Sequence, residues 1–322
     1  MNKSILHINS NITAWVYLIF CLILSLCFSN CRNPMGVQPL DETPTRGNIR
    51  ICVDESFKLL FDTQLYTFQS LYINAKIKAD YKPEKEVIQD LINDSVQNVV
   101  CTRDLTQSEK DFLFSQKYVV RSTKVAHDAI ALIINPENPD SLLLVQQFED
   151  ILKGKLKTWK EINPKSSENA INVVFDNNKS ANVRYFRDKF SLTGNFPSNC
   201  FAVNSNEEVM NYVKKNRNAL GIISVNWISD TRDSTSEHFL KSIKVVEVGK
   251  DDATYCKPYQ GYIAEGSYPF CRDVYMLGRE TFSGLGSGFI SFVAGDKGQR
   301  IILKSGLVPA TMPIRLIEIN RE

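Results

Sequence analysis

Histidine is scarce in this sequence, and its scarcity limits the chemistry that the chain can perform. The 322 residues include three histidines, His7, His127 and His238, which lie far apart, and neither a C-x-x-C nor an H-E-x-x-H motif occurs. Zinc sites usually bring such ligands together at short spacings. We therefore expect no metal site, and nothing in the sequence indicates another cofactor.

The sequence also lacks the motifs of common enzyme classes. It has no G-x-S-x-G nucleophile turn and no Walker A phosphate-binding loop. The glycine-rich stretch Gly284-Leu-Gly286-Ser-Gly288 does not directly follow a predicted strand, so we interpret it as a loop before a helix. No catalytic residue is predicted, and we expect a protein that is not an enzyme.

An excess of charge of one sign is missing as well. The formal net charge is +2, with 43% hydrophobic and 23% charged residues, which is typical of a globular protein. The basic residues are scattered, without the aromatic and basic stripe that binds single strands, so no nucleic acid is expected as a partner. The length suffices for two lobes that each have a core.

The N-terminus predicts a targeting segment over residues 1–31. An apolar run, Ala14–Leu26, follows a weakly basic start; it suits a secretory signal and is short for a membrane span. Cys31 follows Phe-Ser-Asn and resembles the lipidated cysteine of a loose bacterial lipobox, with Cys27 as a poorer candidate. A plain signal peptide or an uncleaved anchor are the alternatives. Residues 32–47, rich in Pro, Thr and Gly, predict a tether.

Strands alternate with helices along the rest of the chain. Strands are predicted over 48–53, 75–79, 98–101, 128–135, 172–175, 219–224, 242–248 and 272–277. Helices are predicted over 58–71, 83–93, 183–190 and 207–216, after a cap at Thr106 or Ser108, and from 288 onward. A short amphipathic helix near 148 ends at Gly154, before a turn in which Trp159 is expected to be exposed. This alternation indicates a parallel α/β sheet.

Cysteines outside the leader give two expectations. Cys52 and Cys101 lie in apolar strand-like runs and predict small buried side chains. Cys256 and Cys271 could pair in an oxidising compartment, although the sequence alone does not establish a disulfide.

Several segments, in order, resemble the PstS-type phosphate-binding proteins. The strand, Pro-rich turn and helix from Asp128 to Ile162 resemble their crossover between lobes. Val99–Thr106 resembles their "SR-x-L" loop, and Asn218–Ser224 resembles their "IGY" strand. Tyr268–Tyr275 resembles their Tyr-Pro segment, and Phe289–Pro309 resembles their C-terminal helix with the closing "GQ…G(Y/L)VP" element. Together these segments span almost the whole mature chain.

The resemblance implies an α/β fold of the two-lobed periplasmic binding protein type II, or Venus-flytrap, class. Each lobe would be a mainly parallel sheet flanked by helices, with lobe I at 48–131 and 260–322 and lobe II at 132–259. Asp128 would support the hinge. The implied function is capture of inorganic phosphate between the lobes and delivery to an inner-membrane ABC permease, with the protein held by a lipid anchor at the cell envelope.

Loops that end a strand and open a helix supply the candidate binding residues. Free backbone N–H groups at helix N-termini bind anions, and strand ends of this topology face a shared cleft. Arg103 adds a bidentate fork, and Lys82 or Arg184 are further candidate cations. The alternative is a helix cap for Glu55, Ser180 and Asn182, a surface salt bridge for Arg103, and a solvated helix face for Glu84. The candidates are Glu55, Ser56, Phe57, Pro83, Glu84, Thr102, Arg103, Ser180, Ala181 and Asn182.

The same loops depart from the family pattern. Asp54–Phe57 replaces a Gly/Ser/Thr-rich loop, Ser180-Ala-Asn182 replaces Ser-Gly-Thr, and an arginine is replaced near Asp176. Glu55 or Asp54 could accept the proton of monohydrogen phosphate and repel sulfate, or could merely cap the first helix. Two other functions therefore stay open: a receptor for another oxyanion or small organic acid, and an envelope interaction or sensory module.

Overall fold

The computed structural model describes residues 42–166, 170–230, 233–252 and 254–313. The predicted signal peptide, Cys31 and most of the predicted tether lie outside these residues. The chain divides after Asp41 into two units, and Glu42–Glu322 contains the described helices and strands. No helix within the described ranges combines the length and hydropathy needed to cross a membrane.

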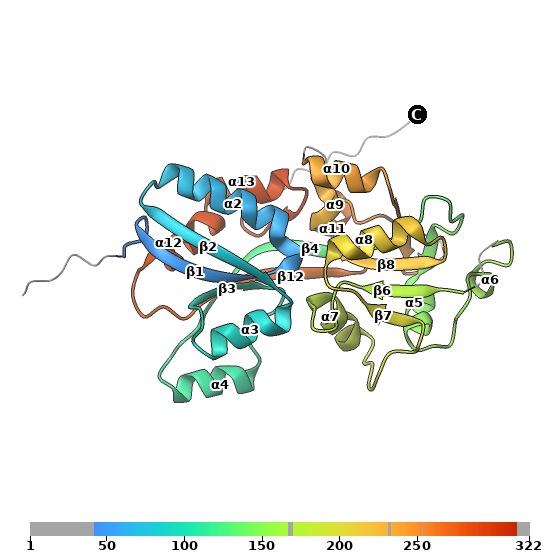
Figure 1. The fold of residues 1–322 in the computed structure, drawn as a ribbon, viewed down its shortest axis with the longest axis horizontal. Helices are drawn as coiled ribbons and strands as arrows, with labels where there is room; N and C mark the ends of the chain where they lie inside the picture. The colour runs from blue at the N-terminus through green and yellow to red at the C-terminus, as the bar shows by residue number, and fades with distance from the viewer. Residues whose placement is uncertain (1–41, 167–169, 231–232, 253, 314–322) are drawn as a thin grey trace, which may run out of the picture. The chain divides into compact units, whose positions relative to one another are not determined.

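The first half of the sheet is parallel, as predicted. It consists of β1 (Gly47–Asp54), β2 (Ala75–Lys82) and β3 (Asn98–Cys101), with β1 between the other two. The helices that follow these strands are α2 (Lys58–Leu71), α3 (Glu84–Ile92) and α4 (Gln107–Ser115). In Figure 1 helix α2 covers one face of these strands, and α3 and α4 lie on the other.

Two long strands connect this half to the rest of the sheet. The order is β2-β1-β3-β12-β4-β8-β6-β7, and β4 (Arg121–Ile134) and β12 (Cys271–Gly278) run antiparallel to each other. The first part of β4 pairs with β12, and its last five residues pair with β8. The strand predicted from Asp128 is therefore longer than expected. It begins at Arg121, because its polar first half pairs with β12.

The second half of the sheet is again parallel. It consists of β6 (Asn172–Phe175), β7 (Cys200–Ala202) and β8 (Ala219–Ser224), with β6 in the middle. Helix α7 (Ala181–Lys189) follows β6, and α8 (Asn206–Lys215) follows β7. A separate small sheet contains β5 (Leu142–Leu144), β10 (Glu247–Gly249) and β11 (Tyr255–Cys256).

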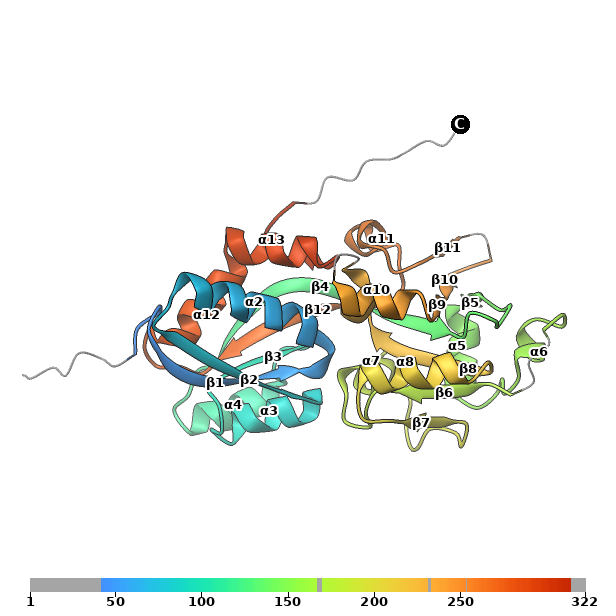
Figure 2. The same ribbon diagram turned by 45° about the horizontal axis from the view of Figure 1, so that its top comes forward.

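The remaining elements lie around the sheet or pair with its long strands (Figure 2). The strand predicted over 242–248 is two short strands, β9 (Lys244–Val245) on β4 and β10 in the small sheet, so that prediction was wrong in detail. The last predicted helix is two helices separated at Gly295. The other elements are α5 (Val145–Leu152), α6 (Trp159–Ile162), α9 (Asn226–Ser229), α10 (Ser234–Leu240), α11 (Gln260–Glu265), α12 (Leu285–Ala294), α13 (Asp296–Lys304) and β13 (Val308–Pro309).

Trp159 corrects another expectation, since it is 1% exposed rather than exposed. Thr158 caps α6 by a capping box with Glu161. The Trp159 ring lies in the core, and its Nε1 donates to the carbonyl of Asn218 at 3.2 Å. A lysine-rich turn thus buries its aromatic residue in the core, next to the segment that leads into β8.

Within the part of the chain that the structure describes, the cysteine side chains are buried or partly buried and unpaired. Cys52 and Cys101 are buried, as predicted from their apolar strands. All five cysteines of the described ranges are free thiols, so the structure contains no bond between Cys256 and Cys271.

Candidate functional site

The end of β1 supplies the first wall of the candidate site. Asp54 ends the strand, and a single 3-10 turn, η1 (Glu55–Phe57), follows before α2. Asp54 Oδ1 accepts from the Ser56 amide at 3.0 Å, while Asp54 Oδ2 and Ser56 Oγ are buried without a hydrogen-bond partner. Asn226, from α9, donates to the Ser56 carbonyl at 3.1 Å. Two polar atoms of this turn are therefore available to a ligand.

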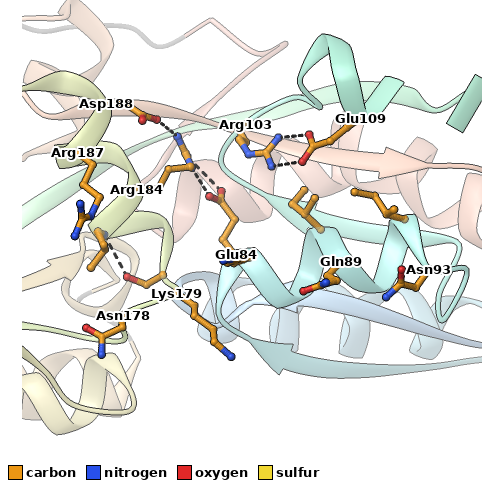
Figure 3. Close-up of a pocket in the computed structure, with 15 residues that line it drawn as sticks. Glu84, Gln89, Asn93, Arg103, Glu109, Asn178, Lys179, Arg184, Arg187 and Asp188 are labelled. Atoms are coloured by element: carbon orange, nitrogen blue, oxygen red, sulfur yellow. Dashed lines mark hydrogen bonds and ion pairs between the residues drawn. The ribbon is translucent and has the colours of Figure 1, made fainter. Parts of the chain in front are cut away.

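Glu84 connects the two halves of the sheet. It is the first residue of α3, and its Oε1 accepts from the amide and hydroxyl of Thr102, at 2.8 and 2.5 Å. Arg184, on α7 in the other half, donates from Nε to Glu84 Oε2 and from Nη2 to Thr102 Oγ1 at 2.8 Å. Figure 3 shows the Arg184 side chain reaching from α7 to Glu84. This cluster joins the ends of β3 and the start of α3 to α7.

A second ion pair lies where the long strands cross. Arg272 of β12 donates from Nε to Asp128 Oδ2 at 2.9 Å and from Nη1 to Asn182 Oδ1 at 2.8 Å. Its Nη2 lies 2.8 Å from Asp128 Oδ2 and completes the ion pair with this carboxylate. The guanidinium lies 5.6 Å from the Phe57 ring centroid. Ser224 Oγ, at the end of β8, donates to Asp128. Arg272 thus joins β12, β4, α7 and the first turn.

The second half contributes two further loops. Asp176 directly follows β6 and accepts from the hydroxyl of Ser180 at 2.6 Å, and Ser180 Oγ caps α7 by accepting from the Val183 amide. Asn206, the first residue of α8, donates from Nδ2 to the Glu55 carboxylate in the first half, and its Oδ1 accepts from the Ser224 amide. Both loops combine a strand end with a helix N-terminus, which is the geometry that suits an anion.

A cavity of about 500 Å³ opens beside the Glu84–Arg184 pair, between α3 and α7. Figure 3 shows its wall, which includes Arg103 and Glu109. The guanidinium fork of Arg103 binds the two Glu109 oxygens at 2.7 and 2.8 Å. Arg103 therefore lies at the cavity with its fork already occupied, which is the ion-pair alternative considered from the sequence.

Burial decides the charges in this region. It raises the pKa of Asp54 to about 8, helped by repulsion from the Glu84 carboxylate, and that of Glu55 to about 7. Burial also raises the pKa values of Asp128 and Asp176, although Arg272 opposes the shift in both. Burial works against ionisation of Glu84 too, but the Arg184 guanidinium and the bonds from Thr102 outweigh it and lower that pKa. At neutral pH, Glu84 is ionised and Asp54 carries a proton.

Comparisons with known proteins identify the superfamily of this chain. A family model described as a PBP superfamily domain matches residues 40–297. The chain belongs to the PBP superfamily. It is also 24% identical to the phosphate-binding protein PstS of Staphylococcus aureus (strain USA300), over 70% of this chain and 67% of that protein.

Solved structures of the PBP superfamily have the same fold. A protein of Clostridium perfringens described as a phosphate ABC transporter substrate-binding protein, with bound phosphate, superposes with a TM-score of 0.71; it is 21% identical over 82% of this chain and all of that chain. An ABC-type phosphate transport receptor of Vibrio cholerae superposes with a TM-score of 0.63, at 21% identity over 83% of this chain and all of that chain. The predicted fold class is confirmed: an α/β fold with a curled sheet and flanking helices, as in these superfamily members.

The structure brings most of the predicted residues of this superfamily member close together. Phe57 faces the Arg272 guanidinium, Ser56 precedes Phe57 in the same turn, and Thr102 and Glu84 share the Arg184 guanidinium. Asn182 binds Arg272, and Ala181 is the first residue of α7. Pro83 is the N-cap of α3 rather than its first residue. The ammonium of Lys82 forms an ion pair with Asp90 Oδ2 at 2.6 Å, within the first half of the sheet. Which of these residues contact a ligand stays a prediction.

Arg272 and Asn206 are the residues that the sequence analysis missed. A weak signal existed for Arg272, since it is a basic residue near the start of a predicted strand, directly after the apolar Phe270-Cys271. For Asn206 the signal was the strand–turn–helix order of 200–215, which repeats the pattern of the loops that were selected. No group of three or more His, Cys, Asp or Glu side chains in the described ranges is arranged to hold a metal.

Proposed function

We propose that this protein captures a small oxyanion, with inorganic phosphate as the first candidate, and catalyses no reaction. One observation carries the proposal: Asp54 Oδ2 and Ser56 Oγ, at the end of β1 and in the turn that follows it, are both buried without a hydrogen-bond partner. A buried donor without an acceptor costs about 1–3 kcal/mol. An oxyanion seated between these groups would supply the missing acceptors.

Protonated carboxyl groups make this acidic region compatible with an anion. Asp54, whose pKa is raised to about 8, can donate its proton to a phosphate oxygen at neutral pH. Glu55, when ionised, can accept the hydroxyl proton of monohydrogen phosphate, whereas sulfate offers no such proton. Arg272 and Arg184 supply the compensating positive charge.

The proposal extends to the transport pathway and the lobes. The relatives above are described as phosphate-binding or phosphate-transport proteins, which supports delivery to an inner-membrane ABC permease as the partner. Residues 48–131 and 260–322 would form lobe I, and 132–259 lobe II. Asp128 would support the hinge, because it lies in β4, which pairs with strands of both halves. A ligand that contacts both lobes favours the closed form.

Attachment to the envelope is proposed from the sequence. Residues 1–31 would be a signal peptide that ends at a lipidated Cys31, and 32–47 would act as a tether to the membrane. Replacing Cys31 with serine should release the protein from the membrane fraction. Retention of the Cys31→Ser variant on membranes would contradict the lipid anchor.

Calorimetric titration tests the proposed ligand directly. The chain from Arg32 to Glu322, stripped of bound ions by partial unfolding and refolding, is titrated with phosphate and then with phosphate in the presence of sulfate. We expect saturable phosphate binding that sulfate does not displace. Absence of heat and of any thermal shift with phosphate, sulfate or small carboxylates would refute the receptor function.

A second candidate function rests on Glu84. Its carboxylate already receives the donors of Thr102 and Arg184, so the fold is held together without a solute. An envelope interaction or sensory module that retains the fold without a ligand would show this feature. Loss of all saturable small-ligand binding in the titration above would favour it.

A further inference from the structure

The carboxylate of Glu84 has the surroundings of a bound anion. Four hydrogen bonds reach it, from the amide and hydroxyl of Thr102 and from Nε and Nη2 of Arg184. The Glu84 side chain is 2% exposed. A backbone amide, a hydroxyl and a guanidinium fork are the donors that a protein uses to hold a carboxylate or phosphate.

Its position on α3 strengthens this comparison. Glu84 is the first residue of the helix, where free N–H groups and the helix dipole favour a negative charge. Burial opposes ionisation of Glu84, but Arg184 and Thr102 outweigh it and lower the pKa of this carboxyl. Glu84 therefore stays ionised at neutral pH. The donors come from both halves of the sheet: Thr102 follows β3, and Arg184 lies on α7.

A neighbouring ion pair shows what an ordinary contact between the halves looks like. Glu86 lies two residues further along α3, and its Oε1 is 2.8 Å from Lys179 Nζ. Both side chains are well exposed. Such exposed pairs contribute about 0–1 kcal/mol. Glu84, in contrast, is buried, has four donors and lies at the wall of the cavity. Glu86 therefore serves as a matched control for Glu84.

We propose that the Glu84 carboxylate is a built-in anion. It fills an anion subsite formed by Thr102 and Arg184, and it holds the two halves together before a solute arrives. An incoming oxyanion must displace it, so Glu84 sets the affinity of the receptor; this last step rests on the proposed phosphate function.

The occupancy of the subsite is tested with Glu84→Ala and small carboxylates. The alanine variant leaves the Thr102 and Arg184 donors empty, and formate is small enough to replace the lost carboxylate. In about 100 mM formate we expect the melting temperature of Glu84→Ala to rise by about 2 °C or more over its value in the same concentration of chloride. The wild type and Glu86→Ala should show no such difference. An equal formate effect in all three proteins would overturn the built-in anion.

Competition is tested with Glu84→Gln, which keeps the size of the side chain and removes its charge. This variant also covers the case in which Glu84→Ala does not fold: its phosphate affinity should exceed that of the wild type by about tenfold, because a like charge has been removed. Equal affinities would refute displacement.

The two tests separate the built-in anion from the phosphate function. Phosphate binding that is the same in the wild type and in Glu84→Gln, without formate stabilisation of Glu84→Ala, refutes the built-in anion and leaves the receptor intact. Formate stabilisation of Glu84→Ala alone, in a protein that binds no phosphate in any form, refutes the phosphate function and supports the built-in anion.

Discussion

Replacing Asp128 with asparagine tests whether the buried ion pair at the strand crossing holds the two halves of the sheet. Asp128 is completely buried, and the Arg272 side chain is 3% exposed. The carboxylate accepts from Arg272 Nε at 2.9 Å and from Ser224 Oγ. The substitution keeps the shape of the side chain but removes its charge, so a guanidinium stays buried without its counter-ion.

The expected loss follows from that uncompensated charge. Breaking one partner of a buried pair costs about 3–5 kcal/mol. The Asn182 oxygen and the Phe57 ring still face the guanidinium, so we expect the free energy of unfolding to fall by about 3 kcal/mol, at the lower end of that range. Arg272→Met should cost less at low pH, because the abandoned Asp128 can take up a proton; burial already raises its pKa.

Urea unfolding of the two single variants and the double variant Asp128→Asn/Arg272→Met measures this coupling. Fluorescence and circular dichroism should give coincident transitions, which justifies a two-state analysis. The double variant should lose less than the sum of the single losses by at least about 1.5 kcal/mol, since it leaves no unpaired charge. Additive losses, or an Asp128→Asn loss below about 1 kcal/mol, would refute the role of this pair.

Three further predictions concern single side chains of the site. Asp54, whose pKa rises from 3.8 to about 8 on burial, binds more protons in the folded state, so stability should fall as pH rises through that window; Asp54→Asn should flatten this slope in thermal unfolding, and a wild-type and variant difference that does not change with pH would contradict the shift. Ser56→Ala removes a buried hydroxyl without a partner, so the unliganded protein should gain up to about 1 kcal/mol in urea unfolding while phosphate affinity falls about tenfold or more by calorimetry; unchanged affinity would exclude Ser56 from the ligand shell. Arg103→Ala should cost about 1 kcal/mol of stability and leave phosphate affinity within about twofold, because Glu109 holds its fork; a tenfold loss of affinity would instead support Arg103 as a ligand residue.

The order of strands and helices could be predicted because its signals are local. Buried parallel strands are short apolar runs such as 98–101 and 219–224, and each ends in a polar turn before a helix. Thr106 was recognisable as a cap, and the structure shows its capping box with Glu109. Trp159 escaped prediction, since its burial depends on the distant carbonyl of Asn218, which no local pattern indicates.

The candidate site was predictable by its loops but not by its pairings. The helix starts at Glu84 and Ser180 follow from sequence patterns, and both lie in the cluster. The partner of Glu84 is Arg184, one hundred residues later, and the partner of Asp128 is Arg272, 144 residues later. Such pairs depend on which strands become neighbours. A single sequence therefore identifies the charged residues of the loops but does not show which of them pair with one another.

The pairing of these charges explains how a superfamily frame can tolerate acidic loops. Helix N-termini and strand-end amides stabilise a negative charge whether it belongs to a ligand or to the chain itself. A glutamate at the first position of α3 therefore stays ionised despite its burial, because a cation such as Arg184 reaches it. Asp54, whose pKa burial and the nearby Glu84 carboxylate raise to about 8, responds to the same crowding by keeping its proton at neutral pH. Under the proposed function, an anion that enters this site replaces Glu84 or accepts a proton from Asp54, so we expect the identity of these two side chains to decide what the site binds.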